Sequence, residues 1–272
     1  MEKDLELVGK ALRGDKKALT LLVESVENLI YNLALKMLWH PQDAEDASQE
    51  VLIRLVTNLN RYKGESRFST WVYRLASNHL LNVLKKKKRE MTFSRLTTEL
   101  EEGLAGSADY AINDGERNLL IQEMKIGCTN GMLQCLDPET RISYILGDIL
   151  GFDGNEGAYI QNIKPPAFRK RLSRARTKLF RFMYANCGVA NPSNSCRCHK
   201  QIKHCIGTGK INPQRLIFAT DGSDVALKNN IERAEQTIRL FNTNPDYRLP
   251  GKAVNELRAL LKISGPKTFR DE

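Results

Sequence analysis

Apolar residues recur at three- and four-residue steps along most of this 272-residue chain, and no other feature constrains its fold as strongly. Within residues 17–38, the steps pass through Leu22, Val26, Leu33 and Met37. Such spacing places apolar side chains on one face of a helix. No stretch alternates apolar and polar residues for long enough to indicate a strand. We therefore expect an all-α protein built from amphipathic helices.

The periodic stretches divide the chain into several parts. Residues 91–118 mix Gly, Ser, Thr, Asp and Glu without sustained periodicity, which is typical of an acidic linker. Two small helical domains are expected on either side of it, and the first contains helices predicted over 17–38, 43–55 and 70–88. The parts are a first helical domain (1–90), the linker (91–118), a second helical domain (119–185) and a C-terminal helical extension (186–272).

The chain is basic, with 42 Lys and Arg against 32 Asp and Glu and a net charge of +10. This excess suits a polyanionic partner, and nucleic acid and an acidic membrane both qualify. The cations gather in two runs on different predicted domains. A basic helix end is also often simply solvated, so charge alone leaves both interpretations open. The runs are Lys85, Lys86, Lys87, Lys88 and Arg89 in the first domain, and Arg169, Lys170, Arg171, Arg174 and Arg176 in the second.

Residues 153–176 have the layout of a helix, a short turn and a second helix. Gly151 ends the preceding helix, and Pro166 can occupy the first turn of the second helix because that position needs no N–H. The second helix, Ala167–Arg176, carries the basic run. In a helix-turn-helix, such a helix enters the DNA major groove while flanking cations meet phosphates. The sequence therefore predicts a DNA-binding helix-turn-helix.

Two polar surfaces of the first domain also suit binding. The turn from Tyr62 through Lys63 to Arg67 mixes an aromatic ring with cations, as surfaces that stack unpaired bases do. The nearby Phe68 and Trp71 are expected to be core residues. The predicted helix 43–55 has a polar face that suits a basic protein partner, formed by Asp46, Gln49, Glu50 and Arg54.

Motifs of catalysis are missing from the sequence. It has no Gly-x-x-x-x-Gly-Lys phosphate loop, no Gly-x-Ser-x-Gly elbow and no His-Glu-x-x-His helix. We predict that the protein is not an enzyme. The first residues lack the layout of a signal peptide, and no apolar run approaches the ~20 residues that span a bilayer. A cytoplasmic protein without membrane contact is expected.

Four of the six cysteines crowd into the start of the extension. Four thiolates can hold one Zn²⁺, although Cys-x-Cys is tighter than the usual pair, and His199 and His204 offer alternative ligands. A thiol redox switch and plain structural cysteines are the other interpretations. No cofactor is required, and zinc is the one the pattern suggests. The candidate ligands are Cys187, Cys196, Cys198 and Cys205, and helices are predicted after them from Leu227 to Phe241 and from Val254 to Leu261.

The stretches Asp43–Glu50 and Arg67–Asn78, followed by the basic run, resemble region 2 of the extracytoplasmic-function (ECF) sigma factors in the sigma-70 family. The stretch Leu136–Leu179 is similar to their region 4. Region 4 departs from the family pattern at several positions. Gly157 and Gln161 replace apolar residues of the first motif helix, Asn162 occupies the usual turn glycine, and Lys164-Pro-Pro166 replaces small polar and Gly residues.

This resemblance implies a role for each surface. The polar face Asp46, Gln49, Glu50 and Arg54 would dock on the clamp helices of the RNA polymerase largest subunit. The segment Tyr62–Arg67, with Arg74 and Asn78, would capture and melt the −10 promoter element. The helix Ala167–Arg176 would enter the −35 major groove. The implied partners are core RNA polymerase and promoter DNA, and an anti-sigma protein would be a further one.

We therefore predict a sigma factor that binds core RNA polymerase, directs promoter-specific transcription initiation and is modulated by its C-terminal extension. The alternative is a free-standing helix-turn-helix regulator that senses metal or redox state through its cysteines. The polar face of helix 43–55 discriminates between them, because only a sigma factor needs it to hold the polymerase.

Overall fold

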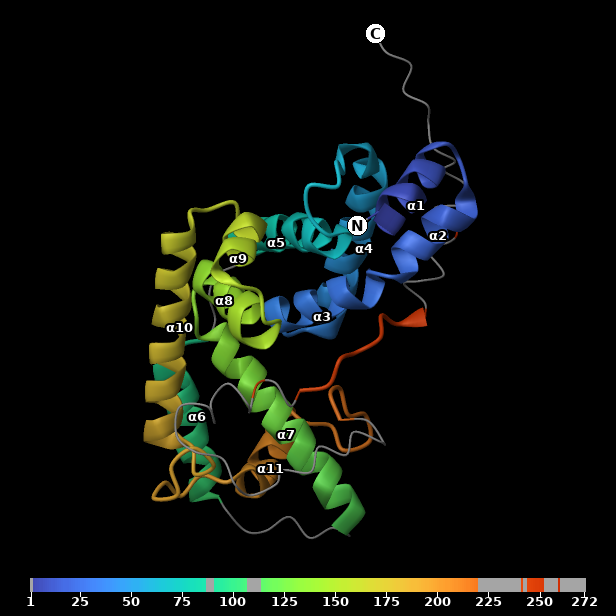
Figure 1. Cartoon of the computed structure of the whole chain (residues 1–272). Helices are drawn as coiled ribbons and strands as arrows, with labels where there is room; N and C mark the ends of the chain where they lie inside the picture. The colour runs from blue at the N-terminus through green and yellow to red at the C-terminus, as the bar shows by residue number, and fades with distance from the viewer. Residues whose placement is uncertain are drawn as a thin grey trace. The chain divides into compact units, whose positions relative to one another are not determined.

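The regular structure of the chain is helical, as the periodicity predicts (Figure 1). The computed structural model describes residues 2–86, 91–106, 114–219, 241, 244–251 and 259. Over these ranges the only β-type pairing is one isolated bridge between Cys187 and Cys196, which confirms the all-α prediction. The elements are α1 (Glu2–Leu12), α2 (Lys16–Glu24), α3 (Glu27–Leu38), α4 (Pro41–Thr57), η1 (Leu59–Arg61), α5 (Phe68–Lys86), α6 (Phe93–Ala105), α7 (Asp114–Gln134), α8 (Pro138–Tyr144), the π-helical turn η2 (Ile145–Ile149), α9 (Gly154–Gln161), α10 (Pro165–Asn186) and α11 (Cys198–Gly207).

The chain forms two compact units that each combine distant parts of the sequence. Unit 1 comprises Met1–Lys87, Asp153–Phe168 and Asp246–Glu272, and unit 2 comprises Lys88–Phe152 and Arg169–Pro245. In unit 1, α3, α4 and α5 pack together (Figure 1). Their core contains the fully buried side chains Ile30, Leu33, Met37, Leu52, Leu55 and Leu80.

The helix predicted over 17–38 is interrupted. α2 ends at Glu24, the Ser25 hydroxyl donates to the Leu22 carbonyl, and α3 begins at Glu27. The stretch 16–38 is also the one part of the described chain that is long and apolar enough to cross a membrane. Here its apolar side chains largely fill the core of unit 1. The apolar pattern does not predict α1, whose buried residues are Val8 and Ala11.

The prediction of a linker without regular structure over 91–118 is wrong for residues 93–105, which form α6, and for residues 114–118, which begin α7. The Thr92 hydroxyl caps α6 by accepting the Arg95 N–H (3.2 Å). Leu96 and Leu100 are its buried anchors, and Gln201 Nε2 of α11 donates to the Leu100 carbonyl (2.9 Å). Two leucines form too short an apolar stripe for the sequence to predict a helix. The surface that buries them belongs to α11, which is distant in the sequence.

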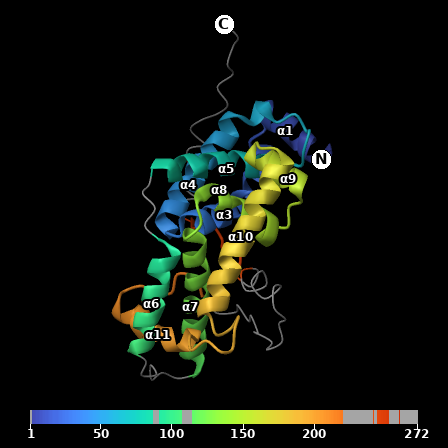
Figure 2. The same cartoon turned by 90° about the vertical axis from the view of Figure 1, so that its left-hand side faces the viewer.

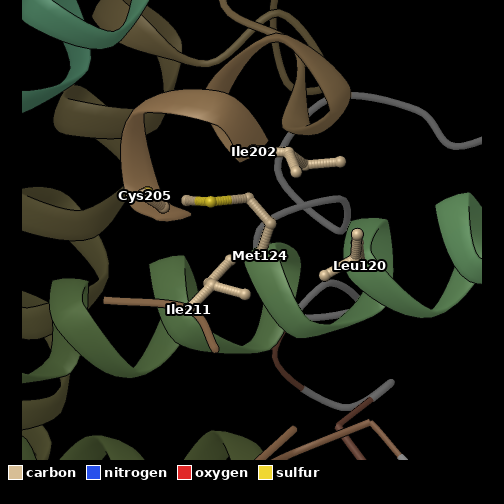
Figure 3. Packing of buried hydrophobic residues seen from close by; sticks show 5 residues of the cluster. All are labelled: Leu120, Met124, Ile202, Cys205 and Ile211. Carbon is tan, nitrogen blue, oxygen red and sulfur yellow. The ribbon is translucent and has the colours of Figure 1, made fainter. Parts of the chain in front are cut away.

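The start of the C-terminal extension is built into unit 2. In both views α6, α7 and α11 lie together (Figures 1 and 2). Figure 3 shows the apolar contact between α7 and α11 from close by. It joins Leu120 and Met124 of α7 to Ile202 and Cys205 of α11 and to Ile211.

A buried carboxylate fixes the chain that follows α11. Glu123 of α7 accepts the backbone N–H groups of Ile217 (2.8 Å), Phe218 (2.8 Å) and Ala219 (2.7 Å). Phe241 is held further along by an edge-on contact with Tyr144. The helices predicted from Leu227 and from Val254 lie outside the described residues, apart from Phe241 and Ala259.

Candidate nucleic-acid interface

α4 presents a polar face above a buried stripe. Asp46, Glu50 and Arg54 are exposed, and Gln49 is partly exposed. The opposite side of the helix, which includes Ala44, Ala47, Val51 and Leu55, is buried. The helical period thus aims all four predicted core-binding side chains away from the core.

A buried histidine lies behind this face. His79 Nε2 of α5 is 3.6 Å from Glu50 Oε2. Burial lowers the pKa of His79, Glu50 opposes that shift, and Arg54 adds to it. His79 is therefore held neutral near pH 7.

The turn before α5 is closed by aromatic packing. Tyr62 is 5% exposed, its hydroxyl donates to the Ser66 carbonyl (2.8 Å), and its ring contacts Phe68 edge-on. Trp71 lies 5.6 Å from the Tyr62 ring, and Phe68 is buried as expected. Tyr62 is therefore not free to stack a base in this conformation, whereas Lys63 is exposed.

Two cations, one just before α5 and one within it, contact α9 in unit 1. Arg67 Nη2 pairs with Glu156 Oε1 (2.8 Å), and Arg74 Nη2 donates to Asn162 Oδ1 (2.9 Å). The Arg74 guanidinium also lies 4.6 Å from the Tyr159 ring centroid, a cation–π contact. α5 and α9 lie side by side in both views (Figures 1 and 2). Further along α5, Asn78, Lys85 and Lys86 are exposed, while Lys87, Lys88 and Arg89 lie outside the described residues.

The helix-turn-helix prediction is confirmed at its turn. The Asp153 side chain caps the start of α9 by accepting the backbone N–H groups of Asn155 and Glu156. At the other end of α9, Asn162 adopts the left-handed conformation (φ 55°, ψ 46°), and α10 then begins at Pro165. Asn tolerates this conformation better than most residues, which explains how it replaces a glycine.

The unusual Gly157 has a packing role. A Cβ at this position would lie 2.2 Å from Cζ of Phe168, the fully buried aromatic residue of the first turns of α10. The apolar residue that the family pattern calls for in α9 is thus replaced by the ring of Phe168, which enters the same space from the following helix.

The predicted recognition residues of α10 fall into two groups. Ala167, Arg169, Lys170 and Arg174 are exposed, and Arg171 is partly exposed. Arg176 instead forms a two-pronged pair with Asp148, whose side chain is only 3% exposed (Nε–Oδ2, 2.9 Å). Asp148 raises the pKa of Arg176 further. Arg176 therefore serves packing in unit 2, which sequence alone does not reveal.

Comparison with known proteins shows which family the chain resembles. A family model described as sigma-70 region 2 matches residues 22–90. The RNA polymerase sigma-H factor of Pseudomonas aeruginosa is 32% identical over 178 residues, which cover 64% of this chain and 91% of that protein. The chain belongs to the ECF sigma factors of the sigma-70 family. The ECF RNA polymerase sigma-E factor of Escherichia coli K12 is 29% identical over 174 residues, covering 64% of this chain and 90% of that protein.

As a sigma factor, the chain is a non-enzymatic protein that directs transcription initiation at promoters with RNA polymerase. Among solved structures, the sigma factor RpoE of Bartonella quintana, crystallised with the anti-sigma factor NepR, aligns at 18% identity and a TM-score of 0.41 over 59% of this chain and 93% of that one. The free-standing regulator is not favoured by the matches to sigma factors.

In the described part of the chain, the structure does not show the zinc site predicted from the cysteines. Over the described residues, no group of three or more His, Cys, Asp or Glu side chains could hold a metal ion. Burial raises the pKa of Cys198 to about 12 and also raises those of Cys196 and Cys205, so these thiols are protonated. The fold brings a fifth cysteine, Cys128 of α7, near this group, which the clustering in sequence does not indicate. Burial raises the pKa of Cys128, and the four predicted zinc ligands raise it further, Cys198 more than the other three.

Proposed function

We propose that this sigma factor docks on core RNA polymerase through the polar face of α4, formed by Asp46, Gln49, Glu50 and Arg54. The observation that carries the proposal is the division of α4 into a fully buried stripe and this outward polar face. Charged side chains held on a rigid helix suit recognition of a basic partner surface. The match to sigma-70 region 2 spans the whole of α4.

For promoter opening, we propose the surface at the start of α5. Arg67 and Arg74 would contact the −10 element, together with the exposed Lys63, Asn78, Lys85 and Lys86. Because Arg67 and Arg74 are paired with α9, their use requires α9 to leave α5. We therefore propose that core binding uncovers this surface. Tyr62, Lys87, Lys88 and Arg89 remain predicted contacts of the same surface.

For the −35 element, we propose that the exposed side of α10 enters the major groove. Arg169, Lys170 and Arg174 are the contacts that the exposure supports best, with Ala167 facing the bases and Arg171 beside them. Arg176 is a weaker candidate because Asp148 holds it.

Run-off transcription with purified core polymerase tests the docking proposal. The double variant Gln49→Ala, Glu50→Ala should lose promoter-dependent transcripts and core binding but keep −35 duplex binding. The variant Glu102→Ala removes one exposed charge from α6, as Glu50→Ala does from α4, and serves as the control. Undiminished transcription by the first variant would contradict the proposal. Duplex binding by the wild type without any core binding would instead favour the free-standing regulator.

The extension is proposed to modulate this activity. Truncation after Ala219 keeps α11 and the three hydrogen bonds to Glu123 but removes the buried Phe241, so a thermal melt first checks that the truncated chain is folded. Core affinity or transcript yield should change in this variant. Equal values for the two chains would contradict modulation by residues 220–272.

Three predictions remain beyond the described contacts. Zinc at Cys187, Cys196, Cys198 and Cys205 does not fit the arrangement of the described side chains, and elemental analysis of purified protein tests it directly: stoichiometric zinc would support the site. Binding of an anti-sigma protein and a cytoplasmic location also stay predictions. Co-purification and cell fractionation address them.

A further inference from the structure

Residues 246–249 of the extension lie along α3 in unit 1 and are held by side-chain amides. Asn32 Nδ2 donates to the Tyr247 carbonyl (2.7 Å), and Asn32 Oδ1 accepts the Tyr247 N–H (2.8 Å). One turn earlier on α3, Asn28 Oδ1 accepts the Leu249 N–H (2.8 Å). The amide of Asn32 thus satisfies both backbone groups of one residue, as a neighbouring strand would.

Lys36 lies one turn beyond Asn32 on α3. Lys36 is 6% exposed, and burial lowers its pKa while Asp246 opposes the shift. Along α3, Asn28 meets Leu249 and the following turn, at Asn32, meets Tyr247, so the segment runs antiparallel to the helix.

The hydrogen bonds from Asn28 and Asn32 require a bound segment with an extended backbone and a defined pattern of groups. The segment must offer N–H groups at two alternate residues and a carbonyl at the first of them. It needs an apolar side chain at the end where Leu249 is buried. When the segment leaves, its neutral amide hydrogen bonds are replaced by hydrogen bonds to water, and the net change in free energy is small. The segment can therefore be released.

We infer that Asn28 and Asn32 form a binding strip for an extended peptide, and that residues 246–249 are its ligand. The strip then fastens the C-terminal extension to region 2 in a reversible way. Neither the polar face of α4 nor the cations of α5 and α10 contribute a side chain to it.

Hydrogen exchange of the full-length chain, resolved by residue, tests the inference without any transcription assay. The Tyr247 and Leu249 amides should exchange at least about tenfold more slowly than that of the intervening Arg248. Asn32→Ala should remove the protection of Tyr247, and Asn28→Ala should remove that of Leu249. Asn60→Ala, an exposed asparagine of η1, should change neither.

A second variant guards against loss of fold. Asn32→Asp keeps the shape and the acceptor oxygen but loses the donor, so it should retain part of the Tyr247 protection. Equal exchange at Tyr247 in the wild type and in a folded Asn32→Ala variant would overturn the inference. Protection that arises only when a second protein is added would also overturn it, because the strip would then serve a partner in place of residues 246–249.

Discussion

The two predicted DNA-binding surfaces differ in what they contact. At the start of α5, Arg67 and Arg74 are bound by the side chains of Glu156, Asn162 and Tyr159. On α10, Arg169, Lys170 and Arg174 are exposed. The same kind of residue, predicted for the same kind of ligand, is thus covered by protein in one place and open to solvent in the other.

This difference teaches that a run of cations does not by itself reveal a surface ready to bind. Sequence spacing places the cations on helices, but acids and aromatic rings from distant segments determine which cations are free. We expect the free sigma factor to bind duplex DNA through α10 more readily than single-stranded −10 DNA through α5. Four changes would break or sharpen this contrast.

The largest effect is expected within α10 itself. Arg176→Ala leaves the buried Asp148 carboxylate without its partner, and we expect the free energy of unfolding to fall by about 2 kcal/mol, reduced from the full cost of breaking a buried pair because Arg176 is half-exposed. Urea denaturation measures it. Arg174→Ala, two residues away and exposed, should change stability by less than about 0.5 kcal/mol. Equal destabilisation by both would show that Asp148 is not what distinguishes them.

Freeing Arg67 should give the next largest effect. Glu156→Lys replaces its ion-pair partner with a like charge, and the affinity of the free chain for single-stranded −10 DNA should rise about fivefold, as expected for an exposed pair. Fluorescence anisotropy with labelled oligonucleotide measures the change. Glu102→Lys on α6 makes the same charge change at an exposed site, and an equal gain there would mean that net charge alone is responsible.

The salt dependence of DNA affinity should distinguish the two surfaces by a smaller effect. Arg169→Ala should reduce the slope of log affinity for −35 duplex against log salt by about one, because one phosphate contact is lost. Arg67→Ala should leave the duplex slope of the free chain unchanged, since that side chain is already paired. A slope reduced by both variants would remove the contrast between α5 and α10.

The smallest effect concerns the buried side of α5. Burial lowers the pKa of His79, so its folded-state pKa lies below the unfolded value of about 6.5. As pH falls below about 6.5, the unfolded chain takes up the proton first, and stability declines until the folded pKa is passed. His79→Gln should therefore weaken the loss of stability between pH 7 and pH 5. Thermal melts over this range would count against the assignment if the two chains declined in parallel.

Much of the fold is predictable from local pattern. The helices α4 and α5, the turn at Asn162 and the start of α10 all follow from short-range spacing and the placement of Asn and Pro. α6 is not predictable in this way, because Leu96 and Leu100 become a buried face only against α11, about 100 residues further along the chain.

The same division holds for the functional surfaces. The outward face of α4 follows from helical period, and its four polar residues lie where the sequence places them. The burial of Tyr62 and the pairing of Arg176 with Asp148 do not follow, since each depends on neighbours that packing supplies. Cys128 likewise comes near the extension cysteines only through the fold.

Residue order alone therefore determined the helical class, the helix-turn-helix, the polar face of α4 and the family, because each rests on interactions between residues a few positions apart. Tertiary structure decided which cations are covered, that the predicted linker carries α6, and that residues 246–249 lie along α3. These features depend on hydrogen bonds and burial between residues about 90 to 220 positions apart, and no local pattern encodes such pairs.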